Sequence, residues 1–215
     1  MKVVAVVPVK TNNERLPGKN TRPLGKIPLI QYCLDTLLQV EEISELYVYC
    51  SDDSIERFLP YKIKFLSRSR ELDKTDTNFT QIFDSFIEKV DADIYVYAHA
   101  TAPFVKTETI RKEICAVMSG DFDSAFCAEK IQDFLWKDGT ALNFDASNIP
   151  RSQDLPIIWR ETSGVYVLCK SVFTDLHKRV GNKPYIAQVT KKEAVDINTY
   201  EDFRLAEMFL EWNEE

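Results

Sequence analysis

The most informative stretch of this chain is Lys10-Thr-Asn-Asn-Glu-Arg-Leu-Pro-Gly-Lys-Asn20. It follows the apolar run Val3–Val9, which predicts a buried strand, so the stretch forms a polar loop at the end of that strand. Ligands of open α/β folds bind at this edge of the sheet. Lys10, Arg15 and Lys19 place three cations on the loop of a chain whose net charge is −7. The pattern favours a polyanion such as a nucleoside triphosphate, and a solvated surface loop is the alternative.

Length and composition set the broad class of the protein. The chain has 215 residues, 45% hydrophobic and 28% charged, which is ordinary for a globular protein. We expect residues 1–215 to form one α/β domain. No apolar run approaches the ~20 residues that span a bilayer, and the N-terminal run is too short for a signal peptide. The acidic balance argues against nucleic acid or a membrane surface as partner. A cytoplasmic protein is expected.

Cysteine and histidine give no sign of a metal centre built from these residues. The five cysteines are widely spaced, odd in number and without a CxxC pair. Cys50, Cys127 and Cys169 lie in or beside apolar runs, which is typical of small core residues in a reducing compartment. Of the two histidines, His177 fits the surface of a helix end, and only His99 lies near the expected site.

Short apolar runs alternate with longer segments of helical period. The predicted strands are Val3–Val9, Leu46–Cys50, Ile94–Ala98, Ser124–Ala128 and Gly164–Leu168. The predicted helices are Gln31–Leu38, Asp53–Phe58, Phe79–Val90, Thr107–Met118 and about Glu201–Trp212. The alternation predicts a mostly parallel sheet with right-handed crossovers. In the last helix we expect an apolar stripe that packs on the core, formed by Phe203, Leu205, Ala206, Phe209 and Leu210.

Residues 131–168 depart from this rhythm. Asp138-Gly139 between two flanking runs is a hairpin signal. We interpret the segment as an insertion that forms a lid or a dimerisation arm.

Four polar segments lie at predicted strand ends: 10–20, 51–53, 99–103 and 196–198. In an open sheet they converge on one crevice, basic on one side and with the carboxylates of Asp52 and Asp196 on the other. Triphosphate chemistry uses this combination, since cations hold phosphates and carboxylates hold Mg²⁺. A P-loop hydrolase is excluded by the absence of a Walker A pattern.

Six collinear motifs resemble those of the acylneuraminate (sialic acid) cytidylyltransferases. They are Val7-Pro-Val-Lys10 with Arg15-Leu-Pro-Gly-Lys-Asn20, Ser51-Asp-Asp53, Thr101-Ala-Pro-Phe104, Arg151-Ser-Gln-Asp-Leu-Pro156, Glu161-Thr-Ser-Gly-Val-Tyr166 and Val195-Asp-Ile-Asn-Thr199. The resemblance implies a Rossmann-like three-layer nucleotidyltransferase fold with a small dimerisation insertion, and hence a homodimer. It also implies an enzyme of class EC 2.7.7 that transfers CMP from CTP to an acidic nonulosonic sugar, with Mg²⁺ as cofactor and pyrophosphate as second product.

The resemblance also assigns roles to residues of this chain. Catalytic roles fall to Lys19, Arg15 and Asp196. Nucleotide contacts fall to Lys10, Asn20, Pro17, Gly18, Arg68, Asp76 and Asn78, with a helix cap as the alternative for Asp76. Acceptor contacts fall to His99, Thr101, Arg151, Gln153 and Tyr166, with Arg160 and Lys130 as further candidates for the acid's carboxylate. The metal ligands would be Asp196 and Asn198.

The chain departs from the family pattern at both ends of the site. Glu14 places a carboxylate in the phosphate loop, and Asn198 replaces the second aspartate of the metal motif. His99 stands where the sialic acid enzymes carry glutamine, and Ser152 replaces an arginine. We therefore expect CTP as donor and an altered acid as acceptor. The alternatives are a catalytically silent CTP-binding homologue and a nucleotidyltransferase with another acceptor.

Overall fold

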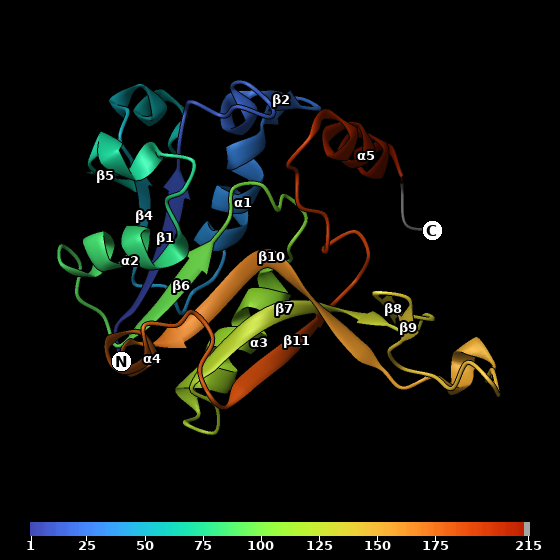
Figure 1. The fold of residues 1–215 in the computed structure, drawn as a ribbon. Coiled ribbons are helices and arrows are strands. Elements are labelled where there is room, and N and C mark those ends of the chain that lie inside the picture. The colour runs from blue at the N-terminus through green and yellow to red at the C-terminus, as the bar shows by residue number, and fades with distance from the viewer. Residues whose placement is uncertain (213–215) are drawn as a thin grey trace.

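The computed structural model describes residues 1–212, which are organised around a seven-stranded sheet (Figure 1). The strands, in spatial order, are β11 (Pro184–Val189), β7 (Ser124–Ile131), β10 (Ile158–Cys169), β6 (Ile94–Ala98), β1 (Val3–Val9), β4 (Glu45–Cys50) and β5 (Lys64–Ser67). Only β10 runs antiparallel to its two neighbours, and all the other pairs of this sheet are parallel. The predicted, mostly parallel α/β fold is confirmed.

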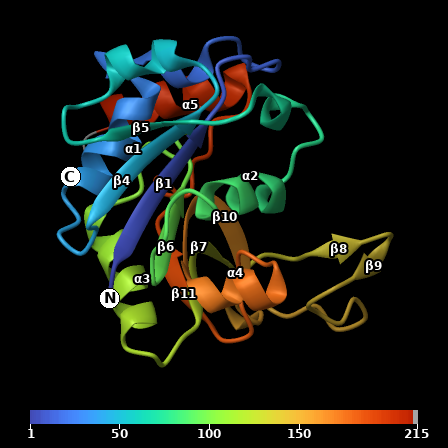
Figure 2. The same ribbon diagram turned by 90° about the vertical axis from the view of Figure 1, so that its left-hand side faces the viewer.

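Helices cover both faces of the sheet, so the molecule has three layers (Figure 2). One face carries α1 (Leu29–Leu38) and α3 (Thr107–Met118), and the other carries α2 (Phe79–Ile87) and α4 (Lys170–Leu176). A fifth helix, α5 (Tyr200–Glu211), packs near α1 against the hairpin of β2 (Pro23–Leu24) and β3 (Ile27–Pro28). The short 3-10 helices are η1 (Lys19–Thr21), η2 (Asp53–Phe58), η3 (Arg70–Asp73) and η4 (Ser152–Asp154). Within residues 1–212, no helix is long and apolar enough to cross a membrane.

The position of β1 inside the sheet explains why its sequence is apolar at every position. Val3, Ala5 and Val7 belong to the core beneath α1 and α3, whereas Val4 and Val6 belong to the core beneath α2 and α4. A strand covered on both faces reads as a continuous hydrophobic run, because neither face is exposed to water.

Several element predictions need correction. Asp53–Phe58 forms the 3-10 helix η2 and not an α-helix. The predicted helix Phe79–Val90 ends at Ile87. In α5, Phe203 and Ala206 are buried as expected, but Leu205 is 45% exposed, so its assignment to the packing stripe is wrong. The analysis of periodicity missed β5, β11 and α4, which are short elements of four to seven residues.

The order of strands creates a crevice at the carboxyl end of β1. From β1 the chain proceeds to β4 and β5 on one side, then crosses to β6 on the other side of β1. Connections therefore leave β1 and β6 in opposite directions, which is the topological switch point where α/β sheets bind ligands.

The inserted segment extends away from the sheet as an arm (Figure 1). Its tip region contains the predicted hairpin, β8 (Trp136–Lys137) and β9 (Thr140–Ala141), joined by Asp138 and Gly139. Both turn residues have positive φ, 49° and 79°, as a tight two-residue turn requires. β10 leads back into the sheet through an irregularity between Glu161 and Tyr166.

A buried acid makes the stability of this fold dependent on pH. Glu113 of α3 is fully buried, and its Oε1 accepts a hydrogen bond from Cys127 Sγ at 3.2 Å. Its Oε2 has no partner within the described residues. Burial raises the pKa of Glu113 to about 8, because the apolar surroundings penalise the charged form.

We predict that the free energy of unfolding falls between about pH 6.5 and pH 8, above the range in which the lowered pKa of His99 acts in the opposite direction. The unfolded state loses the Glu113 proton near its ordinary pKa, while the folded state retains it, so deprotonation favours unfolding by up to about 1.4 kcal/mol per pH unit. Glu113→Gln cannot ionise and should flatten this part of the profile. Glu108→Gln, an exposed position of the same helix, is the control. Chemical denaturation across this range measures the effect, and identical profiles for Glu113→Gln and the wild type would contradict the assignment.

Candidate functional site

The loop that follows β1 turns at the predicted Pro17-Gly18 position. Leu16 is buried against Leu24 and Ile197 and anchors the loop to the body of the protein. Gly18 has φ 66°, which residues with a side chain rarely adopt, and its carbonyl accepts from Arg22 N at 2.9 Å. This turn directs Lys19 inward, whereas Arg15 remains exposed.

Lys19 and Arg15 both bind the segment that follows residue 195. Lys19 is buried, and its Nζ donates to the Ile197 carbonyl oxygen at 2.6 Å. Burial lowers the pKa of Lys19, an effect that the nearby carboxylate of Asp196 opposes. Arg15 donates from one guanidinium nitrogen to Asn198 Oδ1 at 3.0 Å. The structure thus brings two of the three predicted phosphate-binding cations to the predicted metal motif.

Asp196 lies at the centre of a hydrogen-bond network. Thr101 Oγ1 donates to one carboxylate oxygen at 2.5 Å, and Asn198 Nδ2 donates to the other at 2.7 Å. The backbone pairs here too, since Ile197 N donates to Thr101 O at 2.8 Å. Three of the four predicted strand-end segments therefore meet at Asp196. The fourth lies on the other flank of the loop, where Asp52 accepts from Thr11 Oγ1 at 2.9 Å and from Ser54 N.

Three cavities surround this network. The inner cavity, of about 130 Å³, is lined by Pro8, Lys10, Asn13, Lys19, Asn20, His99, Ala100 and Thr101. The loop cavity, of about 420 Å³, is lined by Lys10, Asn13, Glu14, Arg15, Leu16, Lys19, Thr75 and Asn198. The helix cavity, of about 590 Å³, is lined by Glu129, Arg160, Lys191, Ala194, Val195, Asp196, Asn198, Asp202, Leu205 and Phe209. Asn198 borders both the loop cavity and the helix cavity, so the two adjoin at the predicted metal motif.

The inner cavity offers hydrogen-bonding groups to a ligand. Asn13 Oδ1, Asn20 Oδ1 and His99 Nε2 are buried without a partner among the described residues. Buried polar atoms are normally paired, so this group of unpaired atoms is typical of a binding site. Burial lowers the pKa of His99 to about 4, which keeps its imidazole neutral at pH 7. Its backbone N donates to Gly164 O at 3.0 Å and fixes the residue at the sheet edge.

A second polar cluster lies beside Lys10. Arg68, whose side chain is 2% exposed, pairs with Asp73 at 2.8 Å, and Ser51 Oγ donates to the same carboxylate at 2.5 Å. Lys10 Nζ donates to the Asp73 carbonyl oxygen at 3.2 Å and connects this cluster to the loop. Nε and one terminal nitrogen of Arg68 remain without a partner in the described structure. Asp73 belongs to no motif of the sequence, so it was not predicted.

Two other predicted nucleotide contacts, Asp76 and Asn78, lie before the start of α2. Asn78, not Asp76, caps α2, because its Oδ1 accepts from Gln81 N at 3.1 Å and Gln81 returns a bond to the Asn78 backbone. The helix-cap interpretation of Asp76 is therefore wrong, and Asp76 is exposed. Glu14 is exposed and accepts from Thr75 Oγ1 at 2.8 Å, without a cation partner among the described residues.

The predicted acceptor residues are only partly brought together. Tyr166 is buried; its hydroxyl donates to Glu161 at 2.7 Å, and its ring lies 6.1 Å from that of His99. Arg151 pairs with Asp154 at 2.7 Å on the arm. The segment that carries Arg151 and Gln153 lies at the far end of the arm, away from the sheet edge (Figure 1).

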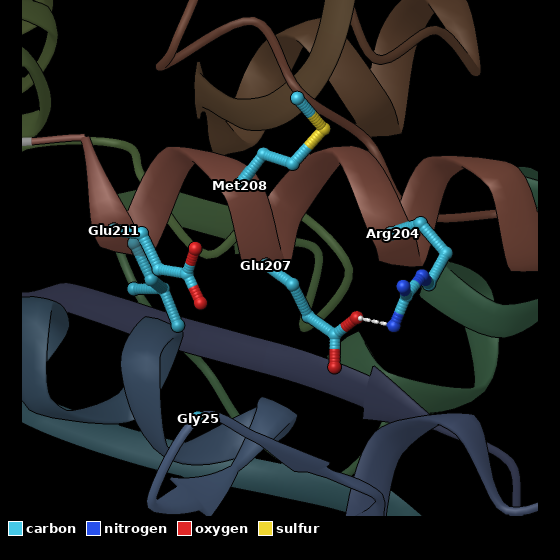
Figure 3. A pocket seen from close by; sticks show the side chains of 6 residues that line it. Gly25, Arg204, Glu207, Met208 and Glu211 are labelled. Carbon is cyan, nitrogen blue, oxygen red and sulfur yellow. Dashed lines mark hydrogen bonds and ion pairs between the residues drawn. The ribbon is translucent and has the colours of Figure 1, made fainter.

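The helix cavity contains charged residues that the sequence analysis did not assign. Arg160 was a candidate, and its Nε donates to Glu129 at 3.0 Å. Lys191 and Glu129 were not assigned, because no motif or periodicity distinguishes them from other surface charges. Asp202 belongs to the motif that begins at Val195, which also includes Glu201, but no role was assigned to it. Asp202 also caps α5 through the Thr199 backbone at 2.8 Å. A further cavity of about 290 Å³ borders α5 near Gly25, where Arg204 and Glu207 pair with each other (Figure 3).

The cytidylyltransferase family model matches residues 4–174. This chain belongs to the cytidylyltransferase family. As a cytidylyltransferase it is a nucleotidyltransferase, as the sequence predicted. The family match begins in β1, includes the cationic loop and Arg68, and ends in α4.

Two curated relatives and one solved structure resemble this cytidylyltransferase. The CMP-N,N'-diacetyllegionaminic acid synthase of Legionella pneumophila is 29% identical, over 100% of this chain and 99% of that protein. An N-acylneuraminate cytidylyltransferase of Streptococcus agalactiae is 23% identical over 94% of this chain, which spans about half (52%) of that longer relative. A CMP:2-keto-3-deoxy-manno-octonic acid synthetase complexed with CTP shares the fold, with a TM-score of 0.73 at 18% identity, over 98% of this chain and 99% of that one.

We predict that Asn198→Asp makes the stability of this cytidylyltransferase depend on divalent cations. The change replaces the amide that donates to Asp196 at 2.7 Å with a second carboxylate, whose repulsion the Arg15 contact offsets only in part. Without metal, a loss of about 1 kcal/mol would lower Tm by roughly 2–4 °C. Mg²⁺ should raise the Tm of the variant more than that of the wild type.

Asn148→Asp is the matched control, because it adds the same charge at an exposed position of the arm. Thermal unfolding with and without MgCl₂ measures both variants. An equal response to Mg²⁺ in Asn198→Asp and the control would show that residues 196–198 do not hold the cation.

Proposed function

We propose that this enzyme transfers CMP from CTP to an acidic nonulosonic sugar and releases pyrophosphate. The loop cavity and the helix cavity share Asn198, and Asp196 lines the helix cavity beside it; this arrangement carries the proposal. A triphosphate in the first cavity and an acid in the second would meet at these residues. The names of the relatives support the same reaction, since two of them act on legionaminic and pseudaminic acids.

The loop cavity suits the triphosphate. Lys10, Arg15 and Lys19 line it, so three cations face the phosphate oxygens. In the proposed reaction, the sugar hydroxyl oxygen forms a bond to the α-phosphorus while the bond from that phosphorus to the pyrophosphate oxygen breaks. Negative charge then increases on the leaving pyrophosphate, where the fixed cations offset it. Holding both substrates in adjoining cavities supplies the orientation that the displacement requires.

The residues of the metal motif suit Mg²⁺, but only one of the two, Asp196, carries a negative charge. Asp196 offers a carboxylate and Asn198 a carbonyl oxygen, both hard ligands. No group of three His, Cys, Asp or Glu residues suited to a metal ion occurs within residues 1–212. Phosphate oxygens of CTP would therefore complete the ligand set. When bound, Mg²⁺ would neutralise phosphate charge, while Thr101 orients the carboxylate of Asp196.

The helix cavity suits the acid. Arg160 and Lys191 line it and offer cations for a carboxylate. Glu129 binds the Arg160 guanidinium and fixes its orientation. His99 and the unpaired amide oxygens of Asn13 and Asn20 are available for hydroxyl or amine donors at the junction of the substrates.

The same proposal includes a homodimer of cytoplasmic single-domain subunits. The arm exposes large apolar side chains, which favour contact with a second copy: Phe134, Trp136, Leu142, Ile149 and Ile157. Such a contact would bring Arg151 and Gln153 close to the acceptor site of the partner. In their own chain, the two residues lie on the arm, away from that site (Figure 1). All five cysteines are free, in agreement with a reducing compartment.

We predict Mg²⁺-dependent pyrophosphate release from CTP with at least one nonulosonic acid. Lys19→Met should lower kcat by about 100-fold or more, because a buried cation facing the reacting phosphates is removed. Lys26→Met, an exposed change close in sequence, should leave it unchanged. CTP binding with no turnover for any acid would favour the silent homologue instead, which the Asn198 replacement makes the second candidate.

We also predict that Ile149→Lys dissociates the dimer. Ile149 is 67% exposed on the arm, and a lysine there would place a charge in the proposed contact. Tyr61→Lys, at a fully exposed position outside the arm, is the control. Light scattering after size-exclusion chromatography gives the mass of each variant, and a monomeric wild type would refute this part of the proposal.

A further inference from the structure

The helix cavity has two chemically different walls. Glu129, Arg160, Lys191, Asp196, Asn198 and Asp202 form the polar wall. The apolar wall consists of Ala194, Val195, Leu205 and Phe209. A ligand that is polar throughout would match only the first of these walls, because its hydroxyl groups would lose hydrogen bonds to water against the second.

Packing of the core accounts for Val195 and, in part, for Ala194 and Phe209, but it does not account for Leu205. α5 buries Phe203 and Ala206 against Leu24 and Leu29, and Leu205 points elsewhere with 45% of its surface exposed. Phe209 is half-buried; its ring contacts Phe104 edge-on at 6.2 Å and stacks on Trp212 at 6.0 Å. Leu205 and Phe209 are separated by one helical turn, so both contribute to the same wall.

The polar wall sets the direction of an acidic ligand. Its reactive end belongs beside Asp196 and Asn198, since Asn198 also borders the loop cavity, and its carboxylate belongs with Arg160 and Lys191. The remaining substituents of the ligand then face α5. Their chemistry is limited by Leu205 and Phe209, which offer no hydrogen-bond donor or acceptor from their side chains.

We propose that Leu205 and Phe209 form a subsite for apolar substituents of the acceptor, so that the enzyme prefers a nonulosonic acid bearing deoxy carbons and N-acyl methyl groups over one with a fully hydroxylated side chain. This inference rests on the proposed function and specifies its substrate class. One apolar group in or out of such a pocket changes specificity by about 10–200-fold.

The test compares two acids that differ in this respect, N,N'-diacetyllegionaminic acid and N-acetylneuraminic acid. For each, kcat/KM with CTP and the equilibrium Kd by calorimetry are measured separately. The variant Leu205→Asn replaces the exposed leucine with a polar side chain of similar size. Met208→Gln is the matched control, because Met208 lies on the same helix, is also exposed and does not line the helix cavity.

The wild type should prefer the diacylated, deoxygenated acid by tenfold or more. Leu205→Asn should reduce that preference about tenfold by weakening use of this acid alone, while Met208→Gln leaves it unchanged. Turnover of both acids at equal kcat/KM, or an equal loss of both in Leu205→Asn, overturns the subsite and leaves the proposed function intact. Preferential binding that Leu205→Asn abolishes, with no turnover of either acid, upholds the subsite and refutes the proposed function. Absence of both binding and turnover refutes both.

Discussion

The buried ammonium of Lys19 donates a hydrogen bond to the carbonyl oxygen of Ile197 at 2.6 Å. The two residues are 178 positions apart, so this contact holds the loop after β1 against a segment near the end of the chain. A buried lysine must be hydrogen-bonded or paired, so the two segments are constrained to stay together. Arg15 and Asn198 form a parallel contact nearer the surface. The three cavities border residues that these contacts position, so the proposed junction of the nucleotide and acceptor regions depends on the contacts.

At this junction, the hydrogen bonds of a neutral side chain connect a cation to a carboxylate. Asn198 bridges Arg15 and Asp196, accepting from the first and donating to the second. An aspartate at this position could not donate, and the two carboxylates would repel each other in the absence of a cation. The asparagine therefore keeps this network intact without a cation, and its neutral amide would attract a cation less strongly than a second carboxylate.

The sequence was sufficient for the parts of the molecule whose composition is constrained by local physics. The uninterrupted apolar run of β1 identified a central strand, and the Pro17-Gly18 turn located the cationic loop. Contacts that form only in the folded chain could not be predicted from local composition. In the sequence, Asp73 and Lys191 resemble any other surface charge. Only the folded structure shows that Asp73 pairs with Arg68 and that Lys191 lines the helix cavity. Leu205 fitted a helical packing stripe, yet it is 45% exposed, because helical periodicity alone does not show where a core ends.

The antiparallel strand β10 has a consequence for the order in which the chain folds. It lies between β6 and β7 in the sheet, although both precede it in sequence. During synthesis β7 has no strand to pair with on the β6 side until the chain has passed Cys169, and β11 pairs only with β7. The edge of β6, with its buried run Ile94–Ala98, remains open for that interval. Exposed hydrophobic edges pair with other chains, so translation through the arm is the period in which the nascent chain is most prone to aggregate.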